Sequence, residues 1–185
     1  LGGENKKRNC APDYDDFPAQ LYLAPGFILP YSAARGCYWR QCAFCPEKTE
    51  ETPYQPLPVA QVNQELTQLI KKYRPVLVHF LDNALSPSML KNLAQHPPGV
   101  PWYGFARISG ELADEDFCIA LKKSGCVMLK LGIESGDQEV LDKLNKGINL
   151  ADASAALKSL KKDGIAAYVY LLFGTPAENE NRVKK

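Results

Sequence analysis

Residues 126–134 read Cys-Val-Met-Leu-Lys-Leu-Gly-Ile-Glu, a short run in which every second side chain is aliphatic. Successive side chains of a β-strand point to opposite faces, so this alternation predicts a strand with one fully apolar face. The residues expected to pack against helices are Val127, Leu129, Leu131 and Ile133. The residues expected on the opposite face are Met128, Lys130, Gly132 and Glu134.

Strand and helix patterns alternate on both sides of this run. Further strands are predicted at 27–31, 76–81, 102–108 and 165–173, and helices at 58–73, from Ser86 onward, and at 113–124, 137–144 and 150–163. Such alternation predicts an α/β fold with right-handed βαβ units and a parallel sheet. No dinucleotide-binding GxGxxG and no Walker loop occurs. We therefore predict a partial (β/α) barrel that stops after about five βα units, with its chemistry at the carboxyl ends of the strands.

The predicted barrel interior is polar, which is unusual for a core built only for stability. Period-two alternation places these residues inside: His79, Asn83, Tyr103, Arg107, Lys130, Glu134, Tyr168 and Tyr170. Phe105 and Ser109 are expected on the same strand face as Arg107. Buried charges are costly unless they are paired, so several together indicate a hydrated cavity that holds a ligand. The structural alternative is a Lys130–Glu134 ion pair that plugs a closed barrel.

A cysteine-rich loop follows the first predicted strand. Residues 35–47 read Arg-Gly-Cys-Tyr-Trp-Arg-Gln-Cys-Ala-Phe-Cys-Pro-Glu, which places Cys37, Cys42 and Cys45 within nine positions. Thiolates bind iron and zinc in preference to magnesium or calcium. Three cysteine ligands on a four-iron cluster would leave one iron open to an external ligand. The loop therefore predicts an iron–sulfur site.

Two other interpretations of the cysteines compete with this one. A structural zinc site usually has four protein ligands, often as two CxxC pairs, and here no second pair exists. Reduced bystander thiols are the other alternative, although they seldom cluster in this way. Cys118 lies in a predicted helix and Cys126 begins a strand, so both are expected to be buried small hydrophobes. The sequence does not assign a role to Cys10.

The cysteine loop resembles that of the radical S-adenosylmethionine (radical SAM) superfamily. The common spacing in that family is Cys-x(3)-Cys-x(2)-Cys, whereas this chain has Cys-x(4)-Cys-x(2)-Cys. The longer form is similar to Arg-Gly-Cys-Tyr-Trp-x-x-Cys-x-Phe-Cys, found in radical proteins that carry a cobalamin-binding domain ahead of the barrel. Residues 12–23 resemble the linker of that subgroup.

The resemblance implies a role for each matching residue. Cys37, Cys42 and Cys45 would hold three irons of a 4Fe-4S cluster, and the amine and carboxylate of S-adenosylmethionine would chelate the fourth iron. Phe44 would pack near the adenine. For the methionyl part, the resemblance implies that Asp82 or Asn83 binds the amine and that Arg107 and Ser109 bind the carboxylate. Glu134 and Ser135 would contact the ribose or the methionyl part, and Gly174 would line the adenosine. Lys130 is a further polar group of the predicted interior that would face the cofactor.

The composition limits the classes of partner. The chain has 22 basic and 21 acidic residues and a net charge of +1, so no field of one sign favours nucleic acid or a membrane surface. A nucleic-acid substrate stays an open alternative. No membrane-length apolar run and no signal peptide is visible. Sparse cysteines with three in one loop indicate a metal site in a reducing cytoplasm.

These patterns predict two regions, a lead-in at 1–26 and a barrel domain at 27–185. The chain begins with Leu1, so we expect a piece of a longer protein from which one to three βα units are absent. The expected function is reductive cleavage of S-adenosylmethionine, with cobalamin-assisted methyl transfer as a subtype. The alternatives are a non-catalytic electron-transfer module and a zinc-stapled interaction domain. Expected partners are a small-molecule or peptide substrate, a reductant such as flavodoxin or ferredoxin, and a second copy through the open edge of the fifth strand.

Overall fold

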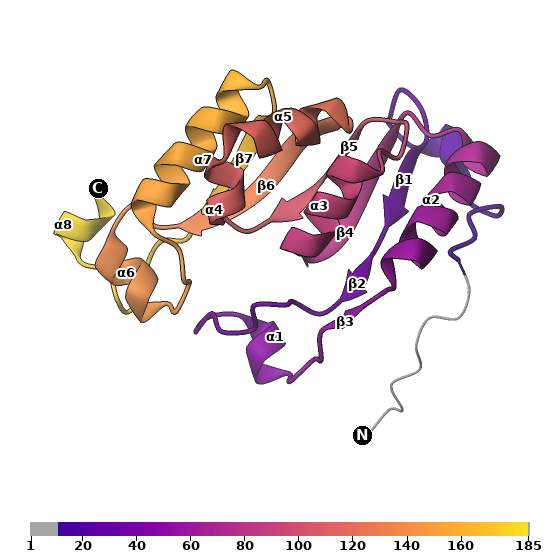
Figure 1. The fold of residues 1–185 in the computed structure, drawn as a ribbon. Coiled ribbons are helices and arrows are strands. Elements are labelled where there is room, and N and C mark those ends of the chain that lie inside the picture. Colours follow the sequence, from indigo (N-terminus) through magenta and orange to yellow (C-terminus); the bar gives the residue numbers. More distant parts are fainter. Residues whose placement is uncertain (1–10, 185) are drawn as a thin grey trace.

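The computed structural model describes residues 11–184, in which a five-stranded parallel sheet has the order β1-β4-β5-β6-β7 (Figure 1). The strands are β1 (Ile28–Tyr31), β4 (Leu77–Leu85), β5 (Trp102–Ala106), β6 (Cys126–Glu134) and β7 (Ala166–Leu171). Apart from the short β2 and β3, strands that follow one another along the chain are neighbours in this sheet. The predicted α/β architecture of a partial barrel is confirmed.

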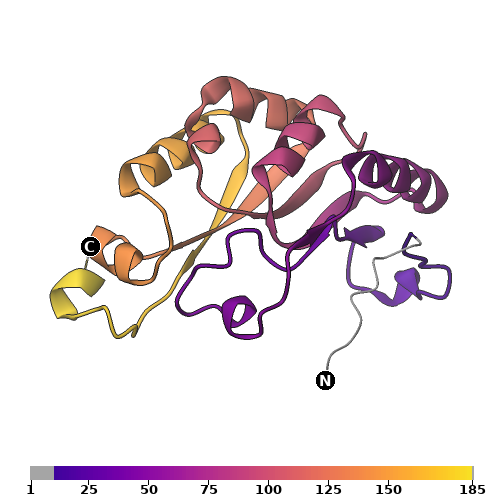
Figure 2. The ribbon, with the colours of Figure 1, turned by 60° about the horizontal axis from the view of Figure 1, so that its bottom comes forward.

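In the part of the chain that the structure describes, the longer helices all cover one face of this sheet (Figure 2). The longer helices are α2 (Val59–Tyr73), α3 (Pro87–Gln95), α5 (Glu115–Lys123) and α7 (Leu150–Lys162), and α6 (Gln138–Lys143) lies near the carboxyl end of β6. Figure 2 shows these helices above the sheet and the cysteine loop below it, across the open face. The arrangement leaves the inner, concave side of the partial barrel free for a site.

The apolar core lies between the sheet and its helices. Trp102 and Phe80 are fully buried, and their rings meet edge to face at 5.7 Å with the Tyr31 ring beyond. The indole of Trp102 donates to the Ser124 carbonyl oxygen and hydroxyl, each at 3.1 Å. The helices contribute buried leucines and alanines at helical spacing, namely Leu66, Leu69, Leu90, Leu93, Leu121, Ala156 and Leu160. This packing fixes the five strands from which the site is built.

One face assignment on β6 is wrong. Val127 was expected against the helices, but its side chain is exposed and Cys126 is buried instead. The pairing of β5 with β6 shifts here, because Trp102 is opposite Cys126 while the next residue, Tyr103, is opposite Met128. This extra residue is a bulge that moves one side chain to the other face. Beyond it, Leu129, Leu131 and Ile133 are buried as predicted.

The predicted helix at 113–124 is confirmed as α5, and a short helix that was not predicted precedes it. The segment forms α4 (Gly110–Ala113) and then α5, and Asp114 separates them. The Asp114 carboxylate accepts from the Phe117 amide at 3.0 Å and so caps the start of α5. A carboxylate at this position satisfies a free amide of the first turn. The predicted cap at Ser86, which begins α3, is confirmed by its bond from the Met89 amide.

Three short elements around the cysteine loop had no signal in the sequence. The strands β2 (Ala34–Arg35) and β3 (Gln55–Pro56) pair antiparallel and close the loop at its base. The helix α1 (Pro46–Thr49) begins directly after the third cysteine. A last short helix, α8 (Glu180–Val183), follows β7.

The described part of the lead-in lies against α2. Tyr14 packs edge to face on Tyr73 at 5.6 Å, and the Tyr14 hydroxyl donates to the Pro30 carbonyl oxygen. Asp13 and Asp15 accept from the Tyr73 hydroxyl, and both form ion pairs with Lys72. These contacts hold residues 13–15 on the helix beside β1. Cys10 lies outside the described residues.

Within the described residues, no helix combines the length and the apolar character needed to cross a membrane.

Candidate iron–sulfur and cofactor site

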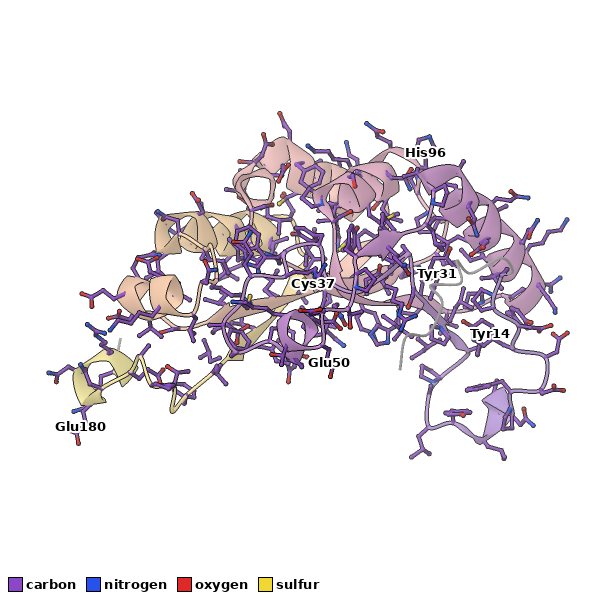
Figure 3. All side chains as sticks on the ribbon, turned by 90° about the horizontal axis from the view of Figure 1, so that it is seen from below. Tyr14, Tyr31, Cys37, Glu50, His96 and Glu180 are labelled. Carbon is purple, nitrogen blue, oxygen red and sulfur yellow. The ribbon has the colours of Figure 1, made fainter. Side chains whose placement is uncertain are left out.

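The cysteine loop lies across the open face, with Cys37 near the centre of the view in Figure 3 and Glu50 beside it. Gly36 begins the loop with φ of +73°, and a β-carbon at this position would lie 2.7 Å from the Pro53 carbonyl oxygen. Only glycine suits both the positive φ and this close approach. The β2–β3 pair then holds the two ends of the loop together.

The three cysteines border one cavity of about 390 Å³ below the carboxyl ends of β4, β5 and β6. All three are free thiols, with Cys42 buried and the other two half-buried. The remaining walls come from Phe44, Pro46, Glu47, Leu81, Asp82, Asn83, Ala84, Phe105, Ala106, Arg107, Gly132, Glu134 and Lys146. Carboxyl ends of parallel strands are where such folds place ligands. Of the residues predicted inside the barrel, Asn83, Arg107 and Glu134 border this cavity.

A turn far away in the sequence clamps the cysteine loop. The turn joins α6 to α7, and the Ala43 amide donates to the Leu144 carbonyl oxygen at 2.8 Å. The Trp39 indole donates to the Asn145 carbonyl oxygen at 3.1 Å. One backbone amide and one side chain of the loop are therefore hydrogen-bonded to residues about a hundred positions later.

Arg107 joins the loop, the clamp and the sheet. It is buried, and its Nη1 donates to the Cys42 Sγ at 3.8 Å while Nη2 donates to the Lys146 carbonyl oxygen. Its guanidinium also lies 4.3 Å from the centroid of the Trp39 ring, a cation–π distance. The guanidinium therefore presents a positive charge and a hydrogen-bond donor to this sulfur.

Glu134 and Lys146 form a buried ion pair in the cavity wall. The Lys146 ammonium lies 2.8 Å from Glu134 Oε1, and the two side chains are 8% and 12% exposed. Lys146 also lies 5.6 Å from the centroid of the Phe44 ring. Lys130 and Glu134, considered above as a plug of the barrel, form no ion pair. In this wall, the ion-pair partner of Glu134 is therefore Lys146.

Glu47 brings a carboxylate to the opposite wall. Its Oε1 accepts from Asn83 Nδ2 at 2.7 Å, while its Oε2 is buried and has no hydrogen-bond partner among the described residues. A buried carboxylate oxygen without a partner is costly, which marks it as a point where a ligand would donate. Asp82 is turned toward the backbone instead, where its Oδ2 accepts from the Ala33 amide at 3.0 Å.

The predicted site residues divide into two groups. The cavity brings together Cys37, Cys42, Cys45, Phe44, Asp82, Asn83, Arg107 and Glu134. Ser109, Lys130, Ser135 and Gly174 do not border it. Ser135 accepts from the Asp137 amide at 3.1 Å, and Ser109 precedes the first turn of α4. The roles of both groups remain predictions.

Sequence reasoning missed Trp39, Glu47 and Lys146. Trp39 and Glu47 lie inside the cysteine loop itself. The position of Glu47 directly after Cys45-Pro46 could have indicated that its carboxylate lies near the site. Lys146 had no such signal, since it follows a short helix in a polar turn. Only the folded chain brings it to the cavity.

The chemistry of the donors suits a 4Fe-4S cluster and S-adenosylmethionine. No three Cys, His, Asp or Glu side chains within residues 11–184 converge closely enough to hold a single metal ion. In a four-iron cluster, by contrast, each of three thiolates binds a different iron. The walls of the cavity also contain the cations Arg107 and Lys146 and the carboxylates Glu134 and Glu47. These charges suit the carboxylate and the ammonium of S-adenosylmethionine.

A parallel partial barrel with three thiols at the carboxyl ends of its strands defines a class of iron–sulfur enzyme. The model of the radical SAM superfamily matches residues 31–185, and the chain belongs to this enzyme family.

Three curated relatives match with statistical support, and the chain spans well under half of the length of each of them. It is 27% identical over 183 residues to an uncharacterized methyltransferase of Pyrococcus horikoshii, covering 94% of this chain and 39% of that protein. It is 27% identical over 164 residues to a bacteriochlorophyllide d C-12(1)-methyltransferase of Chlorobaculum tepidum, covering 83% of this chain and 35% of that protein.

Solved structures share the fold. The cobalamin-dependent S-adenosylmethionine radical enzyme OxsB with aqua-cobalamin bound aligns with a TM-score of 0.65 at 17% identity, over 84% of this chain and 25% of that chain. Methylornithine synthase (PylB) aligns with a TM-score of 0.56 at 17% identity, over 84% of this chain and 48% of that chain.

Proposed function

We propose that the chain binds a 4Fe-4S cluster through Cys37, Cys42 and Cys45 and positions S-adenosylmethionine for reductive cleavage. The observation that carries this proposal is the single cavity bordered by all three free thiols and by charged groups of both signs. When bound, a reduced cluster of this kind supplies one electron to the sulfonium, which breaks a carbon–sulfur bond and releases a 5′-deoxyadenosyl radical. A reductant of the ferredoxin or flavodoxin class would supply that electron.

The residues of the chain bind and orient the cofactor in this proposal. Arg107 holds the Cys42 sulfur, and Lys146 attracts the carboxylate of the methionyl group. Glu47, fixed by Asn83, accepts from the methionyl ammonium through its partnerless Oε2. Glu47 thus takes the amine-binding role first assigned to Asp82 or Asn83. Phe44 and Phe105 supply an apolar wall beside these charged groups.

Cluster binding is tested by anaerobic reconstitution with iron and sulfide. The wild-type protein is expected to become brown and to hold about four irons, as the cluster type requires. Cys42→Ser is expected to lose iron, while Cys118→Ser keeps it, because Cys118 lies in the core and a serine hydroxyl retains the bond to the Leu112 carbonyl oxygen. A colourless product with one zinc and no iron would contradict the proposal and support the zinc-stapled alternative.

Cofactor recognition is tested on the reduced, reconstituted protein by electron paramagnetic resonance. Addition of S-adenosylmethionine is expected to change the cluster signal, and Glu47→Gln is expected to raise the concentration needed at least tenfold. Glu51→Gln, at an exposed position in the same loop, serves as the matched control. A stable cluster whose signal does not change when S-adenosylmethionine is added would support the second candidate, a non-catalytic electron-transfer module.

We infer cobalamin-assisted methyl transfer as the subtype. The names of two relatives are those of methyltransferases, and the solved structure of OxsB is that of a cobalamin-dependent enzyme. The cobalamin would be bound outside this chain, and the substrate would be a small molecule or a peptide. The test is a methyl-transfer assay with and without added cobalamin.

Self-association is a further proposal for β7, which is the last strand in the sheet order. All six of its residues are exposed, and its free edge offers backbone groups for pairing with a second copy. Sedimentation at increasing concentration tests it.

A further inference from the structure

A second group of side chains occupies the open face of the sheet, outside the cofactor cavity except at one residue. We call it the Lys130 face, and it comprises His79 on β4, Tyr103 and Phe105 on β5, Lys130 on β6, and Tyr168 and Tyr170 on β7. The face holds five aromatic rings and one cation. The proposed chemistry of S-adenosylmethionine uses none of these side chains except Phe105.

Lys130 is a cation without an anionic partner. Its ammonium lies 3.4 Å from His79 Nε2, and 5.1 and 5.3 Å from the centroids of the Tyr103 and Phe105 rings. No carboxylate forms an ion pair with it anywhere in the part of the chain that the structure describes. An ammonium has only donors, so the neighbouring Nε2 accepts and is unprotonated.

His79 therefore adds no charge to this face. Burial lowers the pKa of His79, and the positive charge of Lys130 lowers it further. A neutral imidazole beside an ammonium leaves the face with a single positive charge at neutral pH. That charge is half-buried among aromatic rings, where an anion would be attracted more strongly than in bulk water.

The rings form a platform on both sides of Lys130. His79 and Tyr103 stack at 4.3 Å with planes 9° apart, and Phe105 stacks on Tyr170 at 5.1 Å with planes 28° apart. Tyr168 adjoins Tyr170 at 4.9 Å, and these two side chains are 54% and 37% exposed. Exposed aromatic faces gain most by stacking against another flat conjugated surface.

The Lys130 face is continuous with the cofactor cavity. Phe105 belongs to both, since it borders the cavity and also stacks on Tyr170. Tyr103 lies two residues before Phe105 on the same side of β5, so the platform extends by roughly 7 Å from the cavity wall. A molecule on this face would therefore adjoin the cofactor cavity through Phe105.

We propose that the Lys130 face binds the substrate, and that the substrate is a planar conjugated molecule carrying an anionic group such as a carboxylate. The anion pairs with Lys130 and the conjugated plane lies on the Tyr168–Tyr170 side of the platform. The assignment of this ligand as the substrate rests on the proposed function, while its binding does not. An aliphatic anion would leave the rings without a partner, and an aromatic cation would be repelled by Lys130.

The test uses the 185-residue chain without iron, so that its result is independent of cluster assembly. Ligand-observed NMR titrations compare 2-naphthoate with cyclohexanecarboxylate, which lacks the conjugated plane, and with 2-naphthylmethylamine, which has the opposite charge. Saturable binding of 2-naphthoate at least tenfold tighter than of either other probe is expected. The proposed function is contradicted by different results, namely no bound iron after reconstitution or no response of the cluster signal to S-adenosylmethionine.

Substitutions of single lysines test where on the protein 2-naphthoate binds. Lys130→Met is expected to lower the affinity for 2-naphthoate at least tenfold, and Lys130→Arg is expected to retain it. The affinity of the control Lys158→Met, at an exposed position, is expected to stay within twofold of wild type. Protein spectra confirm that each variant is folded. The proposal is overturned if Lys130→Met binds as wild type does, if cyclohexanecarboxylate binds equally well, or if Lys146→Met rather than Lys130→Met abolishes binding, since the probe would then occupy the cofactor cavity.

Discussion

The ring of Trp39 lies directly against the backbone of Gly147, so that a β-carbon at residue 147 would be 2.2 Å from the indole Cζ2. Real β-carbons do not tolerate such a distance from another heavy atom. This contact, together with the bond from the indole to Asn145, fixes the first half of the cysteine loop on the turn after α6. The absence of a side chain at residue 147 is therefore a requirement of the site.

Gly147→Ala is expected to displace Trp39 and to reduce the iron retained after reconstitution by more than half. The control is Gly99→Ala, because Gly99 also has a positive φ, +84° against +64°, but has open space where the methyl group would lie. Both variants carry the backbone strain of about 1 kcal/mol that alanine meets in this region. Equal iron contents in the two variants would show that Trp39 does not position the loop.

The Glu134–Lys146 pair gives a prediction about stability. Lys146→Met leaves the buried Glu134 carboxylate without its cation, so the free energy of unfolding should fall by about 3 kcal/mol. The double variant with Glu134→Gln removes both charges and should recover at least half of that loss. Urea denaturation of the apo-protein measures both values. A double variant less stable than Lys146→Met would contradict this account.

Thiol reactivity should separate the cysteines of the loop from those of the core. Burial raises the pKa of Cys118 to about 11 and that of Cys126 to about 12, and both side chains are fully buried. Alkylation requires the thiolate and access to it. With iodoacetamide at neutral pH, mass spectrometry should therefore find Cys37 and Cys45 modified at least a hundredfold faster. In denaturant the difference should vanish, and similar rates in the native protein would refute the prediction.

Protonation of His79 should oppose folding. Burial and the charge of Lys130 lower the pKa of His79 below its usual value of 6.5, so the unfolded chain binds this proton more readily. The contribution of neutral His79 to the free energy of unfolding is complete above pH 6.5, and it is lost as the pH falls through the pKa of His79 in the folded protein. As the pH falls below 6.5, the free energy of unfolding should therefore decline more steeply in wild type than in His79→Gln. Parallel curves would exclude His79 as the cause.

The fold was largely predictable because each of the five strands of the sheet has its own local pattern. The faces of β6 followed from alternation except at Val127, where a bulge with no sequence signal shifts the pairing. The cysteine loop was also predictable, since its ligands are neighbours in the sequence. Alternation likewise placed Tyr168 and Tyr170 with Phe105, and their ring contacts confirm this.

The electrostatic partners were not predictable, because they depend on contacts between distant segments. Lys146 reaches Glu134 from a turn, and Arg107 donates to sulfur on a different element. Neither contact leaves a periodic pattern in the sequence. The orientation of Asp82 toward the Ala33 amide likewise follows from the pairing of β1 with β4.

The clamp between the cysteine loop and the turn after α6 also has a consequence during synthesis. Trp39 and its partner Asn145 are separated by 106 positions, so a ribosome finishes the loop long before it makes the turn. At about 5–20 residues per second, the thiols of the nascent chain stay unclamped for roughly 5–20 s. During that interval the three thiols lack the contacts that position their loop in the folded protein.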